Sequence, residues 1–93
     1  MTESEQALIA EAEIGDEARR FTESELGKTL LGMADQEIRA AQEELETVDP
    51  TDTKRITALQ NQAKTGRHFK DWLTELIDRG NSALEAWRQN NGE

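Results

Sequence analysis

The sequence predicts an all-α protein, a long antiparallel helical hairpin preceded by a shorter N-terminal helix. The 93-residue chain has one proline and is rich in Glu, Ala, Gln, Leu and Arg, which favour helices. Apolar residues recur at steps of three and four along most of it. Pro50, near the middle, cannot lie inside a helix and marks the turn. We expect one domain over residues 1–93, because the chain is short.

The N-terminal helix is expected over about residues 4–21. Thr2 or Ser4 can accept a backbone N–H bond as its N-cap. Gly15 lies inside this helix and weakens it by roughly 1 kcal/mol relative to alanine. One face carries small and apolar residues at helical spacing, namely Ala7, Ala10, Ile14, Ala18 and Phe21. This face is expected to dock on the rest of the chain.

The second helix is expected over about residues 25–47. Thr22 to Glu25 has the form of a capping box, with Thr22 as the N-cap, so a bend is predicted at residues 22–25. The helix carries a heptad pattern of the kind found in coiled coils. Its members are Gly27, Leu31, Ala34, Ile38, Ala41, Leu45 and Val48.

Residues 48–52 are expected to form the turn, with Asp52 or Thr51 capping a third helix over about residues 53–89. That helix continues the pattern at Ile56, Leu59, Ala63, Gly66, Lys70, Leu73, Ile77, Gly80, Leu84 and Trp87. The register passes through Gly80 unbroken, which favours one long helix over an interruption there. Antiparallel pairing would bring Lys54 and Arg55 toward Glu43, Glu44 and Glu46, and Lys64 and Arg67 toward Asp35 and Glu37.

The charge distribution limits the classes of partner. The net charge is −9. Residues 1–25 hold eight acidic and two basic residues, and residues 26–50 hold six acidic and two basic residues. Residues 51–93 hold six acidic and seven basic residues. The first half is therefore strongly acidic, which argues against direct binding of nucleic acid or of an anionic membrane. The N-terminus is acidic where a signal peptide needs basic residues, so a cytoplasmic protein is expected.

Chemical motifs are missing from the sequence. There is no cysteine, and no phosphate-binding loop, nucleophile elbow or zinc-ligand spacing occurs. His68 is the single histidine, with no Glu one turn before it, so we interpret it as a surface residue. Asp71, Glu75 and Asp78 share one helix and are better explained by pairing with nearby arginines than by metal binding. We expect no catalytic residue, cofactor, metal or small-molecule substrate.

The aromatic residues of the third helix are the main candidates for an interface. A second apolar stripe lies beside the heptad pattern, and the second helix cannot cover both. The candidate interface residues are Phe69, Trp72, Leu76, Leu84 and Trp87. They serve either as core against the first two helices or as a surface for a partner, since aromatics are enriched in interfaces. Homodimerisation, which would complete a bundle, is the simplest such interface.

Several short patterns resemble small helical proteins encoded by bacteriophages and prophages. They are Phe21-x-x-Ser24-x-Leu26-Gly27, Ala34-x-x-Glu37, Val48-Asp49-Pro50-x-Asp52, Ile56-x-x-Leu59-Gln60 and Trp72-Leu73. The resemblance covers residues 19–84. It implies an accessory protein of a virus or its bacterial host, located in the host cytoplasm or on the virion, and it assigns no catalytic residue.

Two functions follow as hypotheses. The first is a non-enzymatic protein–protein interaction module for assembly or regulation, binding itself or another protein. The second is an acidic inhibitor that mimics nucleic-acid charge and blocks a basic site on a host protein. Its candidate acidic surface consists of Glu11, Glu13, Glu43 and Glu44. The second hypothesis depends on charge and would be sensitive to salt.

Overall fold

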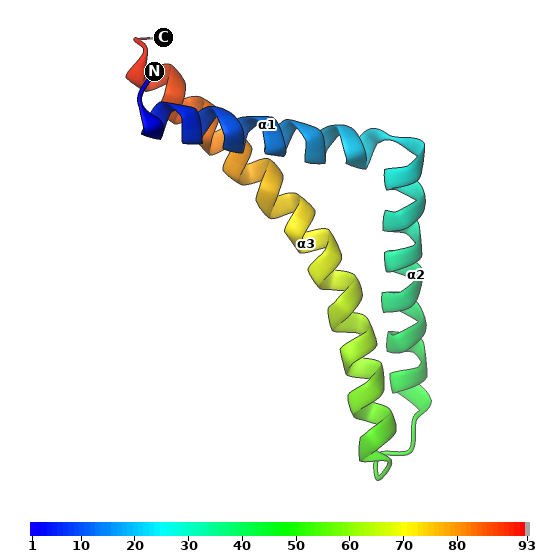
Figure 1. The fold of residues 1–93 in the computed structure, drawn as a ribbon. Coiled ribbons are helices and arrows are strands. Elements are labelled where there is room, and N and C mark those ends of the chain that lie inside the picture. Colours follow the sequence, from blue (N-terminus) through cyan, green and yellow to red (C-terminus); the bar gives the residue numbers. More distant parts are fainter. Residues whose placement is uncertain (93) are drawn as a thin grey trace. The chain divides into compact units, whose positions relative to one another are not determined.

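The computed structural model describes residues 1–92, and these form helices and turns with no strand. Helix α1 spans Glu3–Glu23, α2 spans Glu25–Thr47 and α3 spans Thr53–Asn90 (Figure 1). The predicted all-α class, with a helical hairpin and a shorter N-terminal helix, is confirmed. Dimerisation remains a prediction.

Contacts divide the chain into two compact units. The terminal unit comprises Met1–Ser24 and the chain from Trp72 onward, so it pairs α1 with the C-terminal part of α3. The hairpin unit comprises Glu25–Asp71, so it pairs α2 with the N-terminal part of α3. Within residues 1–92, no helix has the length and apolar character needed to cross a membrane.

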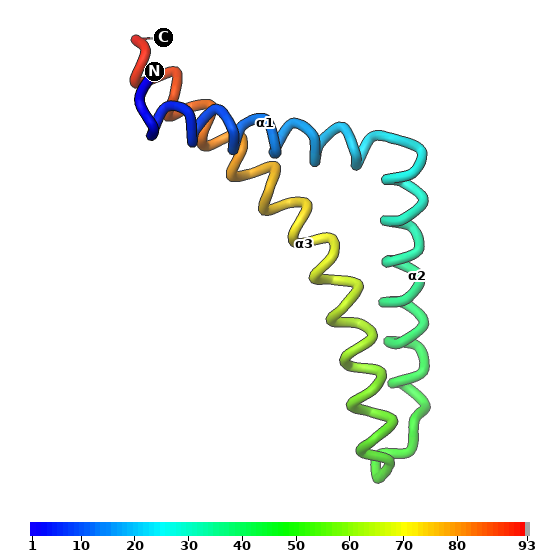
Figure 2. The backbone as a smooth tube through the Cα atoms, viewed as in Figure 1, coloured from blue at the N-terminus to red at the C-terminus, as the bar shows by residue number. Residues whose placement is uncertain are grey.

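Two aspartates hold the turn of the hairpin unit. Figure 2 shows the path of this turn in green, between α2 and α3. Asp49 Oδ1 accepts hydrogen bonds from the backbone N–H of Thr51 at 2.9 Å and from its hydroxyl at 2.8 Å. Asp52 Oδ1 accepts from the backbone N–H of Arg55 at 3.1 Å, which caps the first turn of α3. The turn therefore lies where the sequence predicts it, and Asp52 is the cap.

Small residues set the packing of the hairpin unit. Ala41, Leu59 and Ala63 form its buried cluster, with Leu45 and Val48 packed against it. These residues belong to the predicted heptad patterns, so the expected faces of α2 and α3 do meet. Because alanine contributes little side chain, the core is thin, and Leu59 is the one large side chain of the described chain that is fully buried.

Ion pairs across the hairpin unit match the prediction at one end. Arg55 pairs with Glu44, as expected, and its Nη2 donates to Glu44 Oε1 at 2.6 Å. The sequence predicts Lys64 and Arg67 on the side of Asp35, but the ion pair that Asp35 forms is with Lys70, 2.6 Å from its Nζ. Lys70 lies in the apolar register of α3, and its long side chain carries the ammonium out to the carboxylate.

The predicted capping box between α1 and α2 is wrong in detail. The Thr22 hydroxyl donates to the carbonyl of Arg19 at 2.7 Å and so lies within α1. The Ser24 hydroxyl donates to the carbonyl of Phe21 at 2.6 Å, where α1 ends. The Thr22 hydroxyl thus bonds back into its own helix, as Ser and Thr hydroxyls often do. The location of the break at residues 22–25 is nevertheless as predicted.

The terminal unit is built on a close approach of two glycines. A Cβ atom placed on Gly15 would lie 2.7 Å from Gly80 Cα and 2.8 Å from the carbonyl oxygen of Leu76. The backbones of α1 and α3 therefore touch at a point where no side chain fits. Gly80 lies inside α3, which continues through it without the interruption that the sequence left open.

The face that α1 buries differs from the predicted one. Ala7 and Ala10 are exposed, and Ile14 is 48% exposed. Ala18 and Phe21 are buried and half-buried, as expected. The partly or fully buried residues of the first four turns are instead Glu5, Leu8, Ile9, Ala12 and Gly15. Contact through Gly15 decides this orientation, because it turns the neighbouring Leu8–Ala12 side of α1 toward α3.

Candidate functional site

A groove of about 590 Å³ lies in the terminal unit between α1 and the C-terminal part of α3. Seven of its lining residues come from α1 and two from α3. They are Leu8, Ile9, Ala12, Glu13, Asp16, Glu17, Arg20, Leu84 and Trp87. The residues near the N-terminus of α1 and on α3 are apolar, whereas those further along α1 are charged. The groove thus has an apolar floor and a charged rim, a combination typical of binding sites.

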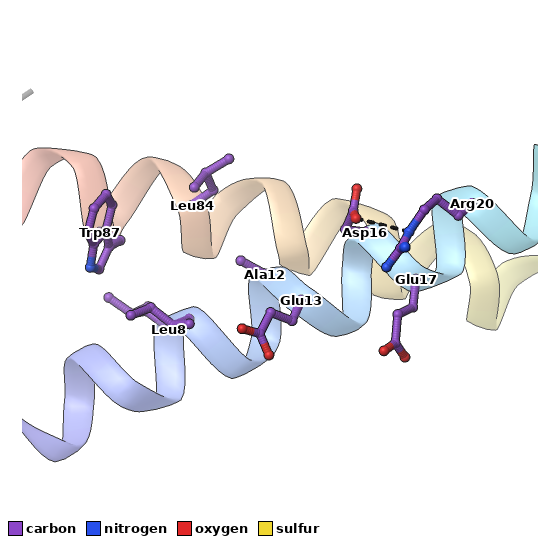
Figure 3. A pocket seen from close by; sticks show the side chains of 9 residues that line it. Leu8, Ala12, Glu13, Asp16, Glu17, Arg20, Leu84 and Trp87 are labelled. Atoms are coloured by element: carbon purple, nitrogen blue, oxygen red, sulfur yellow. Dashed lines mark ion pairs between the residues drawn. The ribbon is translucent and has the colours of Figure 1, made fainter.

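The apolar floor is centred on Trp87. Figure 3 shows its ring on α3 facing the side chain of Leu8 on α1. Leu84, one turn earlier on α3, is 37% exposed and offers further apolar surface. The Trp87 Nε1 atom is buried and has no hydrogen-bond acceptor in the described residues. An unpaired buried donor costs about 1–3 kcal/mol, so this site is not optimised for stability alone.

The rim contains one neutralised carboxylate. Asp16 forms ion pairs with Arg19 and with Arg20, whose Nε lies 3.1 Å from Asp16 Oδ2. The hydrogen bond from Arg19 lowers the pKa of Asp16, and the positive charges of both arginines add to the effect. Asp16 therefore remains ionised at neutral pH, but its charge is largely compensated.

The other two rim carboxylates are uncompensated. Glu13 and Glu17 lie one turn apart and project from the same side of α1 (Figure 3). Among residues 1–92, neither forms an ion pair or a side-chain hydrogen bond. Two carboxylates at this spacing repel each other by a few tenths of a kcal/mol. The rim can accept a cation without breaking an existing pair.

The five predicted interface residues are divided between the two units. Leu84 and Trp87 line the groove of the terminal unit. Leu76 is half-buried, and its carbonyl abuts Gly15. Trp72 is 63% exposed, and Phe69 belongs to the hairpin unit, where it lines a second groove. Two of the five predicted residues, Leu84 and Trp87, therefore line the groove of the terminal unit.

The predicted acidic residues also fall in different units. Glu13 lines the groove of the terminal unit, and Glu11 lies on the same helix. Glu43 and Glu44 belong to the hairpin unit, where Glu44 is paired with Arg55. The hydrogen bond from Arg55 lowers the pKa of Glu44, with a smaller contribution from the attraction of its charge. Glu44 is therefore part of the hairpin's own ion pairing.

The second groove, of about 570 Å³, lies in the hairpin unit between α2 and α3. Its lining combines apolar and uncharged polar residues with one carboxylate, and consists of Met33, Ala34, Gln36, Glu37, Gln62, Thr65, Gly66 and Phe69. Gln62 Nε2 donates across it to the carbonyl of Glu37 at 3.1 Å. This groove has a single carboxylate, that of Glu37, and lacks two neighbouring like charges such as those of the first groove. Its lining therefore favours no particular class of ligand.

Sequence reasoning missed six residues of the groove, namely Leu8, Ile9, Ala12, Asp16, Glu17 and Arg20. The spacing of Leu8, Ala12 and Gly15 is as helical as that of the predicted face. The deciding signal was the pair of glycines, one in each helix, which allows helices to approach closely. The glycines are visible in the sequence, but the sequence does not determine which glycine of one helix contacts which glycine of the other.

No metal centre is formed by the described residues, in which no three His, Asp or Glu side chains converge. No protein-family model, curated protein or solved structure matches the chain.

Proposed function

We propose that this chain is a non-enzymatic protein–protein interaction module, an accessory protein of assembly or regulation, that binds its partner in the groove of the terminal unit. The observation that supports it is the accessible apolar floor at Trp87 and Leu84 beside a charged rim. Interfaces commonly combine an aromatic anchor with a polar border. The resemblance to phage and prophage proteins suggests a bacterial cell as the place to seek the partner.

Capture of the partner by matched variants tests this proposal. Ala12 lines the groove, so Ala12→Leu adds side-chain volume there. Ala40, exposed on α2, provides the control Ala40→Leu, which makes the same change in the hairpin unit. We expect one protein to co-purify in a fixed ratio with wild type and Ala40→Leu but not with Ala12→Leu. Circular dichroism checks that all three are equally helical.

Two outcomes of that experiment would contradict the proposal. One is a protein retained equally by all three chains, which would place binding elsewhere. The other is the absence of any stoichiometric partner from every bacterial extract in which the chain is expressed.

The acidic-inhibitor hypothesis also has support. The terminal unit holds eleven acidic and four basic residues, a net charge of −7, whereas the hairpin unit holds nine and seven, a net charge of −2. We propose it as the alternative, in which the partner is a nucleic-acid-binding protein. It predicts competition between this chain and DNA or RNA for that partner, with steep salt dependence. Binding that survives high salt and excess nucleic acid would exclude it.

A further inference from the structure

The groove of the terminal unit has a length that suits a helix. Its lining runs along α1 from Leu8 to Arg20. Twelve residues of helix rise about 18 Å at 1.5 Å per residue, which is a little more than three turns. An amphipathic helix can lay its apolar stripe in such a groove and keep its polar flank at the rim.

The charge of the groove specifies the polar flank of that helix. Glu13 and Glu17 are unpaired and one turn apart, so they match two cations one turn apart on an opposing helix. Asp16 is already compensated by Arg19 and Arg20. An acidic flank would meet these carboxylates and the remaining net charge of the unit as like charge, which disfavours binding.

A second copy of the chain is a poorer occupant. Neither unit of the chain carries net positive charge, because the acids outnumber the bases by eleven to four in one and by nine to seven in the other. The net negative charge of both units therefore opposes self-association through the groove. Nucleic acids and anionic membranes are disfavoured for the same reason.

We infer that the groove formed by Leu8, Ala12, Leu84 and Trp87 receives a Lys- or Arg-rich amphipathic helix of another protein, with Glu13 and Glu17 binding its basic flank. This inference rests on the proposed function and adds the chemical class of the partner. The apolar floor supplies most of the binding and the two glutamates select the sign of the flank, since exposed ion pairs each contribute little.

Two synthetic peptides of about 18 residues test the sign of the charge on the flank. This length covers the groove and leaves nearly one turn of helix at each end. They share a leucine stripe and differ only in carrying Lys or Glu on the flank. The full chain is titrated with each by calorimetry. We expect the Lys peptide to bind with a micromolar dissociation constant and the Glu peptide to bind at least about tenfold more weakly, or about 1.4 kcal/mol.

Two charge-matched double variants locate the site. Glu13→Gln with Glu17→Gln removes the rim charges, and Glu43→Gln with Glu46→Gln removes two charges of the hairpin unit. All four side chains are exposed, so both variants are expected to fold. The rim variant is expected to weaken the Lys peptide about fivefold or more, whereas the control changes affinity less than twofold. Ala12→Leu is expected to abolish binding of the Lys peptide.

Four results would overturn the inference. In the peptide titrations, these are equal affinity for the two peptides, and no binding of the Lys peptide at about 1 mM. With the variants, the third is an equal loss of affinity for the Lys peptide in the two double variants. The fourth is a dimer, detected by sedimentation, that Ala12→Leu disrupts. Equal binding of the peptides, together with partner capture that depends on the groove, would refute the basic helix and leave the interaction module standing. Failure of the capture experiment would instead remove the proposed function itself.

Discussion

The contact between Gly15 and Gly80 gives the sharpest prediction about the fold. In Gly15→Ala, the new methyl group would lie 2.7 Å from Gly80 Cα and 2.8 Å from the Leu76 carbonyl oxygen. Both neighbours are backbone atoms, so relief requires one helix to move away from the other. Alanine also contributes a gain, because it is about 1 kcal/mol better than glycine within a helix.

The magnitude follows from these opposing effects. Overpacking costs about 1–3 kcal/mol, and the rigid backbone neighbours place this case in the upper half of that range. After the gain in helix propensity, Gly15→Ala is expected to reduce the free energy of unfolding by about 1–2 kcal/mol. For a domain of this size, that corresponds to a fall in Tm of roughly 4–16 °C, measured by thermal unfolding with far-UV circular dichroism.

Gly32→Ala is the matched control for this substitution. Gly32 also lies inside a helix, but a Cβ atom there would meet nothing within 4 Å. Only the gain in helix propensity then remains, so Gly32→Ala is expected to raise the free energy of unfolding by up to about 1 kcal/mol. If both variants were more stable than wild type, the close approach of α1 and α3 would be refuted.

Three further predictions concern the hairpin unit. In Gly66→Ala the new Cβ would lie 2.8 Å from the side-chain atom Ile38 Cγ1, and its nearest backbone neighbour, the Ala34 carbonyl oxygen, would lie at 3.0 Å. Because Gly15→Ala meets two backbone atoms at shorter distances, chemical denaturation should show a smaller loss of stability for Gly66→Ala, and an equal or larger loss would contradict this. Leu59 is 1% exposed in a thin core, so Leu59→Ala should lower the free energy of unfolding by about 2–5 kcal/mol, and a loss under about 1 kcal/mol would show that the core lies elsewhere. Arg55 lowers the pKa of Glu44, so this pair stabilises the fold above the unfolded pKa, and the contribution is lost as pH falls through the lower folded pKa. Unfolding midpoints measured from neutral pH to below about pH 4.5 should therefore fall less steeply for Glu44→Gln than for wild type, and parallel profiles would exclude the effect.

The hairpin could be predicted because its signals are local or periodic. Pro50 and Asp52 fix the turn by backbone chemistry that needs no partner from elsewhere in the chain. The heptad spacing of Ala41 and its neighbours selects one face of each helix, and the unbroken register through Gly80 predicted a continuous α3.

The terminal unit could not be derived in the same way. Two faces of α1 have comparable helical spacing, and the sequence favoured the one containing Ala7 and Ile14, which the structure leaves exposed. The outcome depends on Gly15 meeting Gly80, residues 65 positions apart in the sequence, and hence on shape complementarity between distant segments. Composition and periodicity contain no information on which small residues meet.

The sequence by itself therefore determined the helical class, the turn and the acidic character of the first half of the chain. Only the tertiary structure decided which carboxylates stay unpaired beside an apolar floor, because ion pairing and burial depend on distances between side chains of different helices. Glu44 and Glu13 are alike in the sequence, yet one is bound by Arg55 and the other lines the groove.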